Sequence, residues 1–360
     1  MSIVSTAPPS APPAPAIATA PKPGALKTLK GFALGATAAC MATTVTEPFD
    51  VVKTRLQLQG EHRTPLSLPS TTSPSPRLHL YRTTADAFTT MIRTEGPRSL
   101  YKGLLPAYAF QVAMNGTRLG LYDPVRGWVQ RTVFKGQEEQ QVWLSALTAG
   151  AMCGAVGAAV GSPLFMVKVR LQAYVREAAA TAAAGKGSGV VVVGAQHDEV
   201  RRGFLSALGH VARTEGVRGL WRGVDVGVVR FSTGSAVQLS TYELLKPRVR
   251  RIMGSAPNPT VDALAAACAQ VAVVTAIDPM DVVYSRMLNQ KTSTSGTPLY
   301  RNSIHCLVAT VRNEGVRALY KGYIPHLARA GPQGVLTLTF LDALKRWMGM
   351  GVPTPTGRGK

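Results

Sequence analysis

Two arginines, Arg230 and Arg329, occupy matching places in a repeated pattern and could bind a doubly charged anion. Each lies seven residues after the glycine of a basic residue–glycine dipeptide, and Phe110 occupies the same place after a third such dipeptide. If the segments superpose, the three side chains lie at one height and face a common pore. Two guanidinium groups in a partly dehydrated pore favour a compact anion of charge near −2, because each can hold a carboxylate or sulfate through two hydrogen bonds. Phe110 supplies no third charge, so a nucleotide fits less well.

Neutral side chains near this level could complete a substrate-binding site. The next position in the three segments holds Gln111, Phe231 and Ala330. Gln111, together with Asn115 one turn further on, could hydrogen-bond a keto or hydroxyl oxygen. His326 could carry a symported proton, since imidazole titrates near neutral pH; the alternative is a histidine that is simply packed in the interior.

Three motifs recur in fixed order, and they divide most of the chain into three copies. Segments that begin at Pro48, Pro163 and Pro279 open the pattern, with spacings of 115 and 116 residues. Each is followed by a Glu-Gly pair whose glutamate lies seven residues before the base of the dipeptide. An acid 20 residues beyond the dipeptide's glycine, with a base three residues later, closes each copy. The chain is therefore a triplicated unit.

Composition narrows the class of protein. The 360 residues include 40 Lys+Arg and 19 Asp+Glu, a net charge of +21, yet only 16% are charged and 46% are hydrophobic, which argues against disorder. The four cysteines form no Cys-x-x-Cys pair, so a disulfide scaffold and a zinc ribbon are both disfavoured. A nucleic-acid binder would concentrate its basic residues and interleave aromatic ones, whereas here bases recur with the repeat and aromatics make up 6%. Nothing in the sequence indicates an enzyme, a cofactor or a metal site.

Each copy contains two mostly apolar stretches of the length that crosses a bilayer as a helix. Charged and amide residues interrupt them, and the mean hydropathy is only +0.08, which suits helices with one face toward lipid and one toward a wet cavity. The alternative is a soluble helical solenoid, but solenoid repeats run to about 20–45 residues. The expected spans are 28–46, 103–122, 143–161, 223–242, 260–277 and 322–341.

The ends and two insertions are predicted to lie outside the repeats. Residues 1–25 are rich in Pro and Ala and lack the features of a secretory signal, so we expect a disordered tail. Residues 60–79 and 176–200 occupy the same slot in the first two copies, and we interpret them as loops. The expected units are a tail at 1–25, repeats at 26–135, 136–254 and 255–348, and a second tail at 349–360.

The threefold Pro-x-[Asp/Glu]-x-x-[Lys/Arg]-x-[Lys/Arg] signature and the [Tyr/Trp]-[Lys/Arg]-Gly triplets resemble those of the mitochondrial carrier family over residues 26–348. The resemblance implies an all-α membrane protein, a monomeric barrel of six transmembrane helices with threefold pseudosymmetry and three short matrix helices, in the mitochondrial inner membrane. It also implies a small metabolite as substrate and cardiolipin as a lipid partner. The strings Asn115–Arg126 and Arg286–Gln290 resemble the oxaloacetate/sulfate carrier branch.

The resemblance assigns a matrix gate to the proline-centred segments. In the family, the acid of one odd-numbered helix pairs with the base of the next, which implies the pairs Asp50–Lys168 and Asp281–Lys53. The third pair would be Phe165 and Tyr284, where both the acid and the base are replaced. Loss of one partner would strand a buried charge at a cost of about 3–5 kcal/mol, whereas replacing both can be nearly neutral. Gln57 and Gln172 could hydrogen-bond beneath the two ion pairs.

A second ring of charges is expected at the opposite, cytoplasmic end. Breaking one ring while the other forms would give alternating access, with substrate binding supplying the difference. The alternative is a set of solvated pairs three residues apart, each worth tenths of a kcal/mol. The residues of this cytoplasmic gate are Asp123, Arg126, Glu243, Lys246, Asp342 and Lys345.

These observations predict a secondary transporter of small dianions such as oxaloacetate or sulfate. The alternative within transport is an exchanger of another dicarboxylate or keto acid. The sequence does not choose between exchange and proton symport.

Overall fold

The computed structural model describes residues 25–60, 81–133, 142–174, 203–253, 259–290 and 299–349. Nearly all of the two insertions and of the two tails predicted above lies outside these residues. Within the described residues the regular structure is entirely helical.

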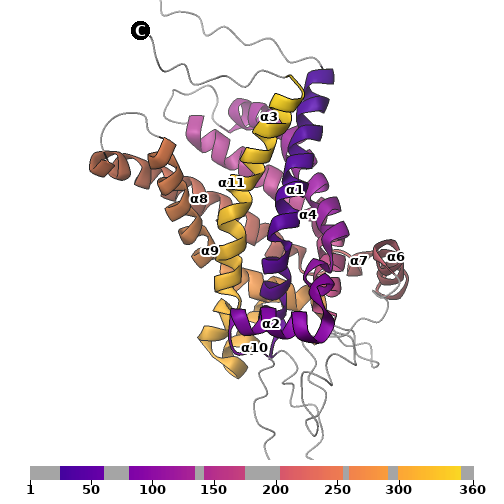
Figure 1. Ribbon diagram of the computed structural model, residues 1–360. Helices are drawn as coiled ribbons and strands as arrows, with labels where there is room; N and C mark the ends of the chain where they lie inside the picture. The colour runs from indigo at the N-terminus through magenta and orange to yellow at the C-terminus, as the bar shows by residue number, and fades with distance from the viewer. Residues whose placement is uncertain are drawn as a thin grey trace, which may run out of the picture.

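Six long helices form the body of the molecule, each 25 to 34 residues in length. Each contacts two neighbours, so that they close a ring in the order α1, α3, α4, α8, α9, α11 and back to α1; Figure 1 shows α11 lying along α1. The six helices are α1 (Ala25–Leu58), α3 (Leu104–Thr132), α4 (Val142–Ala173), α8 (Val224–Met253), α9 (Pro259–Asn289) and α11 (Tyr323–Trp347).

Short helices connect the members of each long pair. Within a copy, the first long helix contacts a short helix of 11 or 12 residues, and a single helical turn then leads into the second long helix. The same order in all three copies matches the triplication read from the motifs. These elements are α2 (Thr84–Glu95), η1 (Pro97–Tyr101), α6 (Phe204–Thr214), α7 (Gly216–Gly219), α10 (Ser303–Glu314) and η4 (Val316–Tyr320).

The first long helix of each copy continues through the signature proline. Pro48, Pro163 and Pro279 lie inside α1, α4 and α9, and each helix ends ten residues beyond its proline. Proline removes one helical hydrogen bond and favours a bend, while the residues beyond it keep their helical bonds. The positions of the acid, the base and the second base in each signature therefore lie in the last turns of these helices.

Polar side chains lie inside the bundle and many apolar ones lie outside. Fully buried groups include Arg55, Arg170 and Arg286, whereas Leu105, Val335 and Leu338 are each more than 60% exposed. Fully buried arginines and highly exposed large apolar side chains are both unusual in a water-soluble protein. Within the described residues, two helical stretches, Thr148–Ala173 and Ala267–Asn289, are long and apolar enough to cross a membrane by length and composition.

A glycine is required where each second long helix begins. Gly103, Gly223 and Gly322 have φ of +87°, +76° and +86°, a conformation that residues with a Cβ rarely adopt. A Cβ on Gly322 would lie 3.1 Å from the Lys53 carbonyl oxygen of α1, and one on Gly103 would lie 3.2 Å from the Lys168 carbonyl oxygen of α4. The basic residue–glycine dipeptide thus allows a tight turn against the neighbouring helix.

Gly322→Ala is expected to lower the stability of the folded protein by roughly 1–3 kcal/mol, because it combines left-handed backbone strain with a close contact. The matched control is Gly331→Ala in the same helix, where an added Cβ meets nothing within 4 Å. That substitution should be neutral or slightly stabilising, since alanine is the better helix former. Thermal unfolding in detergent measures both, and equal midpoints for the two variants would contradict the argument.

Candidate substrate-binding site and gate

Three side-chain contacts join the last turns of α1, α4 and α9, and they are the three pairings expected from the signatures. Lys168 Nζ lies 2.5 Å from Asp50 Oδ2, and Lys53 Nζ lies 2.5 Å from Asp281 Oδ2. Between α4 and α9, the rings of Phe165 and Tyr284 stack with centroids 5.1 Å apart and planes 8° apart. We call these six residues the contact layer.

The side chains of the contact layer are largely buried, and this burial determines how strongly its ion pairs are held. The side chains of the two ion pairs are at most 10% exposed. A buried pair is held together strongly once formed, and removing one partner is costly because the other is left unsolvated. The aromatic contact at the third position contains no charge that could lose its partner, and its two rings still fill the space between α4 and α9.

The two signature glutamines differ in what they hold. Gln172 accepts from Thr54 at 2.7 Å and donates to Glu47 at 2.9 Å and to Asp50 at 3.4 Å, so it braces the Asp50–Lys168 pair as expected. Gln57 instead accepts from Ser285 at 2.8 Å, and within the described residues its amide nitrogen has no hydrogen-bond partner. In this conformation Gln57 therefore donates no hydrogen bond to the Lys53–Asp281 pair among the described residues, and its role beneath that pair stays a prediction.

Each residue seven places after the dipeptide glycine contacts the acid position of a neighbouring signature. Arg329 Nε lies 3.0 Å from Asp50 Oδ1, and Arg230 forms an ion pair with Asp281. Phe110 packs on Phe165 with centroids 5.2 Å apart. The residue at this position therefore makes the corresponding contact in all three copies. In the contact between α3 and α4 both residues are aromatic, so Phe110 joins Phe165 and Tyr284 in replacing charged residues by rings.

The two arginines are therefore already engaged by carboxylates, partners that the sequence analysis did not assign to them. The Arg329 side chain is 25% exposed and that of Arg230 is 9% exposed. A dianion that bound these guanidinium groups would have to compete with Asp50 and Asp281 for them. An arginine that turned to the anion would no longer bind its acid in the contact layer. Anion binding would therefore weaken that layer, and the two would be linked.

The described neutral residues of the expected site contact other side chains within the bundle. Gln111 donates to Thr43 Oγ1 at 3.2 Å, and Gln333, which the sequence reading missed, donates to the same hydroxyl at 3.3 Å. The Arg230 guanidinium lies over the Phe231 ring, 4.8 Å from its centroid, a cation–π contact. The Asn115 side chain lies outside the described part of the structure.

The expected ring at the opposite end is open where it is described. Asp123 and Asp342 are exposed, Arg126 and Lys345 are half-buried, and no ion pair joins these four side chains. The side chains of Glu243 and Lys246 lie outside the described part. The second gate thus stays a prediction, and its described charges are free to pair in another conformation.

Three further ionic clusters were not recognised as sites from the sequence. The second base of each signature is buried and forms an ion pair with the glutamate of the Glu-Gly motif, which also binds the base seven residues later. The Nε of the same base also donates a hydrogen bond, 3.0 to 3.2 Å long, to a backbone carbonyl in the first long helix of the next copy. In the sequence, the constant spacing of seven residues between the glutamate and the later base was the signal that these two residues belong together. The clusters are Arg55–Glu95–Lys102, Arg170–Glu215–Arg222 and Arg286–Glu314–Lys321.

The glutamates of two clusters are held in the ionised form. Burial raises the pKa of Glu95, but hydrogen bonds and charge from Arg55 and Lys102 outweigh burial, so that the pKa lies below its usual value. The pKa of Glu314 is lowered in the same way by Arg286 and Lys321. Both carboxylates therefore hold their cations at neutral pH.

Two buried acids immediately before the signature prolines were also missed. Glu47 lies 3.3 Å from Lys168 Nζ, which places a second carboxylate on that base. Asp278 is 2.8 Å from Nδ1 of His326, and both residues are at most 1% exposed. The third copy has Asp and the first has Glu at this position, while the second has Ser162; an acid in two of three copies was the available signal.

Comparison with known proteins gives one family across the chain. The family described as "Mitochondrial carrier protein" matches residues 24–133, 139–252 and 255–351. These three matches correspond to the three copies of the motifs.

Several relatives are similar over nearly their whole length. A "Mitochondrial citrate transporter E" of Aspergillus niger is 36% identical over 89% of this chain and 94% of its own. A "Mitochondrial oxaloacetate transport protein" of Saccharomyces cerevisiae is 35% identical over 86% of this chain and 87% of its own. "Solute carrier family 25 member 35" of Mus musculus is 37% identical over 87% of this chain and 97% of its own.

Proposed function

The chain belongs to the mitochondrial carrier family and is a transporter rather than an enzyme, and on that premise we propose that it carries small dianions across the mitochondrial inner membrane. The proposed substrates are oxaloacetate, sulfate and related dicarboxylates. The observation that supports this proposal is the threefold set Arg230, Arg329 and Phe110: two guanidinium groups, each bound to an acid with which an anion could compete, and one uncharged ring.

The proposed transport cycle uses the contact layer as the matrix gate. In the conformation described here the layer is closed, and the described charges at the other end are unpaired. A dianion that binds Arg230 and Arg329 takes a cation from each gate acid and weakens the layer. Pairing of the opposite ring then compensates for the lost contacts, which gives alternating access.

The membrane topology in this proposal has six spans. The ring of six helices, its exposed apolar residues and its buried charges support it, because charges in a bilayer face a bundle interior. The start of α1 and the end of α11 lie together at one end of the bundle (Figure 1). We assign that end to the intermembrane space and the short helices to the matrix side.

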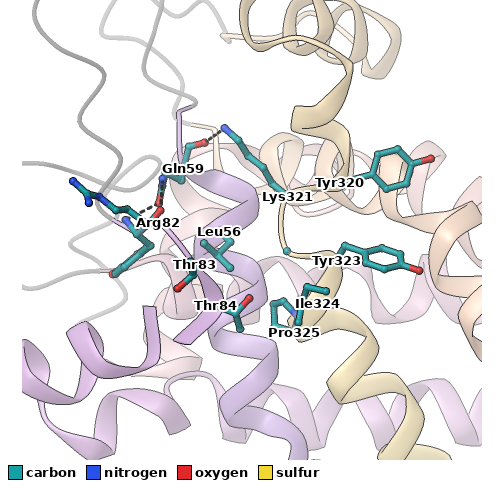
Figure 2. A pocket seen from close by; sticks show the side chains of 12 residues that line it. Leu56, Gln59, Arg82, Thr83, Thr84, Tyr320, Lys321, Tyr323, Ile324 and Pro325 are labelled. Atoms are coloured by element: carbon teal, nitrogen blue, oxygen red, sulfur yellow. Dashed lines mark hydrogen bonds between the residues drawn. The ribbon is translucent and has the colours of Figure 1, made fainter. Parts of the chain in front are cut away.

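A surface pocket of about 600 Å³ is the proposed cardiolipin site. It lies between the start of α2, with Thr83 and Thr84, and the start of α11, with Gly322 and Tyr323 (Figure 2). Helix starts present free N–H groups to a phosphate. Lys321 contributes less than the triplet suggested, since it forms an ion pair with Glu314 at 2.5 Å and donates to the Gln59 carbonyl at 2.8 Å.

A substrate panel in reconstituted vesicles tests the function. Exchange of labelled oxaloacetate or sulfate is expected to exceed that of citrate and ATP at least about tenfold, because a third negative charge would lie against Phe110 without a partner. Faster exchange of a different dicarboxylate or keto acid would favour the alternative substrate class. Citrate exchange equal to that of oxaloacetate would overturn the assignment of the site, even though one relative is named as a citrate transporter.

A further inference from the structure

A buried acid and a buried histidine form a pair between α9 and α11 that the transport site does not use. Asp278 Oδ1 lies 2.8 Å from His326 Nδ1, and the second acid within reach, Asp281, has Oδ2 3.3 Å from the same nitrogen. The other oxygen of Asp278 is buried and has no hydrogen-bond partner among the described residues. The exposed fractions of Asp278 and His326 are 0% and 1%.

A carboxylate in this position is costly when it is ionised. Burial of an ion with an oxygen that accepts no hydrogen bond loses hydration without replacement. One added proton removes the net charge of the pair, whether it resides on the imidazole or on Asp278. Without that proton the pair carries one negative charge.

The charged groups around the pair are already committed to other partners. Lys53 of α1 and Arg230 of α8 bind Asp281 of α9, and Arg329 of α11 binds Asp50 of α1. Within the described residues, no lysine or arginine forms an ion pair with Asp278. Three nearby cations also oppose a divalent metal ion at Asp278, Asp281 and His326.

Anion binding changes what His326 faces. When Arg230 turns from Asp281 to a substrate carboxylate, Asp281 loses one of its two cations. His326 then lies between two acids, which favours a protonated imidazole. The anion and a proton therefore bind with positive coupling, and each strengthens the binding of the other.

We infer that Asp278 and His326 form a proton-carrying pair that moves one proton together with the transported anion, an inference that rests on the proposed transport function. As the anion binds, a hydronium ion in the cavity loses one O–H bond and becomes water, and its proton forms an N–H bond at His326 or an O–H bond at Asp278. When the contact layer opens, water reaches Asp278, that bond breaks, and the proton passes to matrix water as the anion leaves. The product is symport of one proton with a dianion.

The test uses the full-length protein in vesicles, with the membrane potential held at zero by valinomycin and equal potassium. The steady accumulation of oxaloacetate in wild-type vesicles should change about tenfold for each unit of pH difference, as one coupled proton requires. In Asp278→Asn the amide resembles the protonated acid and can still accept from His326. Homo-exchange of oxaloacetate should be reduced but remain measurable, while accumulation should no longer follow the pH difference.

The matched control is Asp225→Asn, an exposed acid of α8 that binds the Ser303 hydroxyl, which should keep both exchange and the tenfold response. A trapped pH dye gives a second measurement in the wild type: acidification of the lumen when oxaloacetate is added, absent in protein-free vesicles. If Asp278→Asn does not fold, loss of the response in His326→Gln takes its place.

An unchanged response to pH in both variants would overturn the proton-carrying pair, as would wild-type exchange without any effect of pH on accumulation. In both cases the proposed transport function stands, because homo-exchange reports on it separately. Absence of dianion exchange in the wild type would overturn both.

Discussion

Alanine at Arg230 or at Arg329 is expected to lower oxaloacetate uptake into vesicles at least about a hundredfold. Each substitution removes a guanidinium group that would clamp one carboxylate of the substrate, and loss of a desolvated charge pair of this kind costs about 3–5 kcal/mol. Each also leaves a gate acid with fewer cations: Asp281 keeps Lys53, and Asp50 keeps Lys168. Transport should therefore fail before the fold does, and a melting curve in detergent should still show a cooperative transition.

Lysine at either position separates charge from geometry. It preserves a cation for the gate acid but cannot form the bidentate contact, so uptake should fall between the wild-type and alanine values. Arg218→Ala is the matched control, since Arg218 is exposed on the short helix α7, and it should transport at the wild-type rate. Uptake near the wild-type rate by both alanine variants would remove Arg230 and Arg329 from the site.

The contacts of the layer could be predicted because the family resemblance implies which helices pair, and the matched replacement at Phe165 and Tyr284 fits that pairing. Once three signatures repeat, the base of one helix faces the acid of another, and a missing acid at Phe165 can be tolerated only opposite a missing base at Tyr284. Burial makes this a strong constraint. The stacked rings and the two 2.5 Å ion pairs satisfy it.

The partners of the arginines could not be predicted in the same way. Repeat register gives the height of Arg230 and Arg329 along their helices, but a long side chain reaches several ångströms across the bundle, and its direction depends on which acids are near. Only the folded ring shows that these acids are Asp281 and Asp50. The sequence therefore indicated two cations for the proposed binding site but not that acids of the proposed gate bind the same two cations.

The acids before the prolines were missed for a different reason. Glu47 and Asp278 lie outside the signature, and a single acid beside a proline is an ordinary helix residue until its surroundings are known. Their significance comes from burial against residues of other helices: Lys168 of α4 for Glu47, and His326 of α11 for Asp278. Such contacts between distant segments leave no pattern in one sequence beyond the recurrence of an acid in two of the three copies.

Phe165→Asp and Tyr284→Lys, each made alone, are expected to lower the apparent melting temperature by roughly 5–10 °C, whereas the double variant should recover at least half of the loss. The aspartate alone would be buried beside the Phe110 ring, and the lysine alone would lie near Arg230. Together they would recreate the ion pair that Asp50 and Lys168 form in the neighbouring contact.

The double variant should also transport more slowly than the wild type at equal stability, because a third ion pair has to break each time the gate opens. Phe165→Leu and Tyr284→Leu serve as controls that remove the stacked rings without burying a charge, and they should melt within a few degrees of the wild type. The energetic coupling between the two charged substitutions tests whether Phe165 and Tyr284 are in contact. If they are, the two stability losses should not add, because the double variant replaces an aromatic contact with an ion pair. A double variant that loses the sum of the two single losses would show that Phe165 and Tyr284 do not face each other in the closed gate.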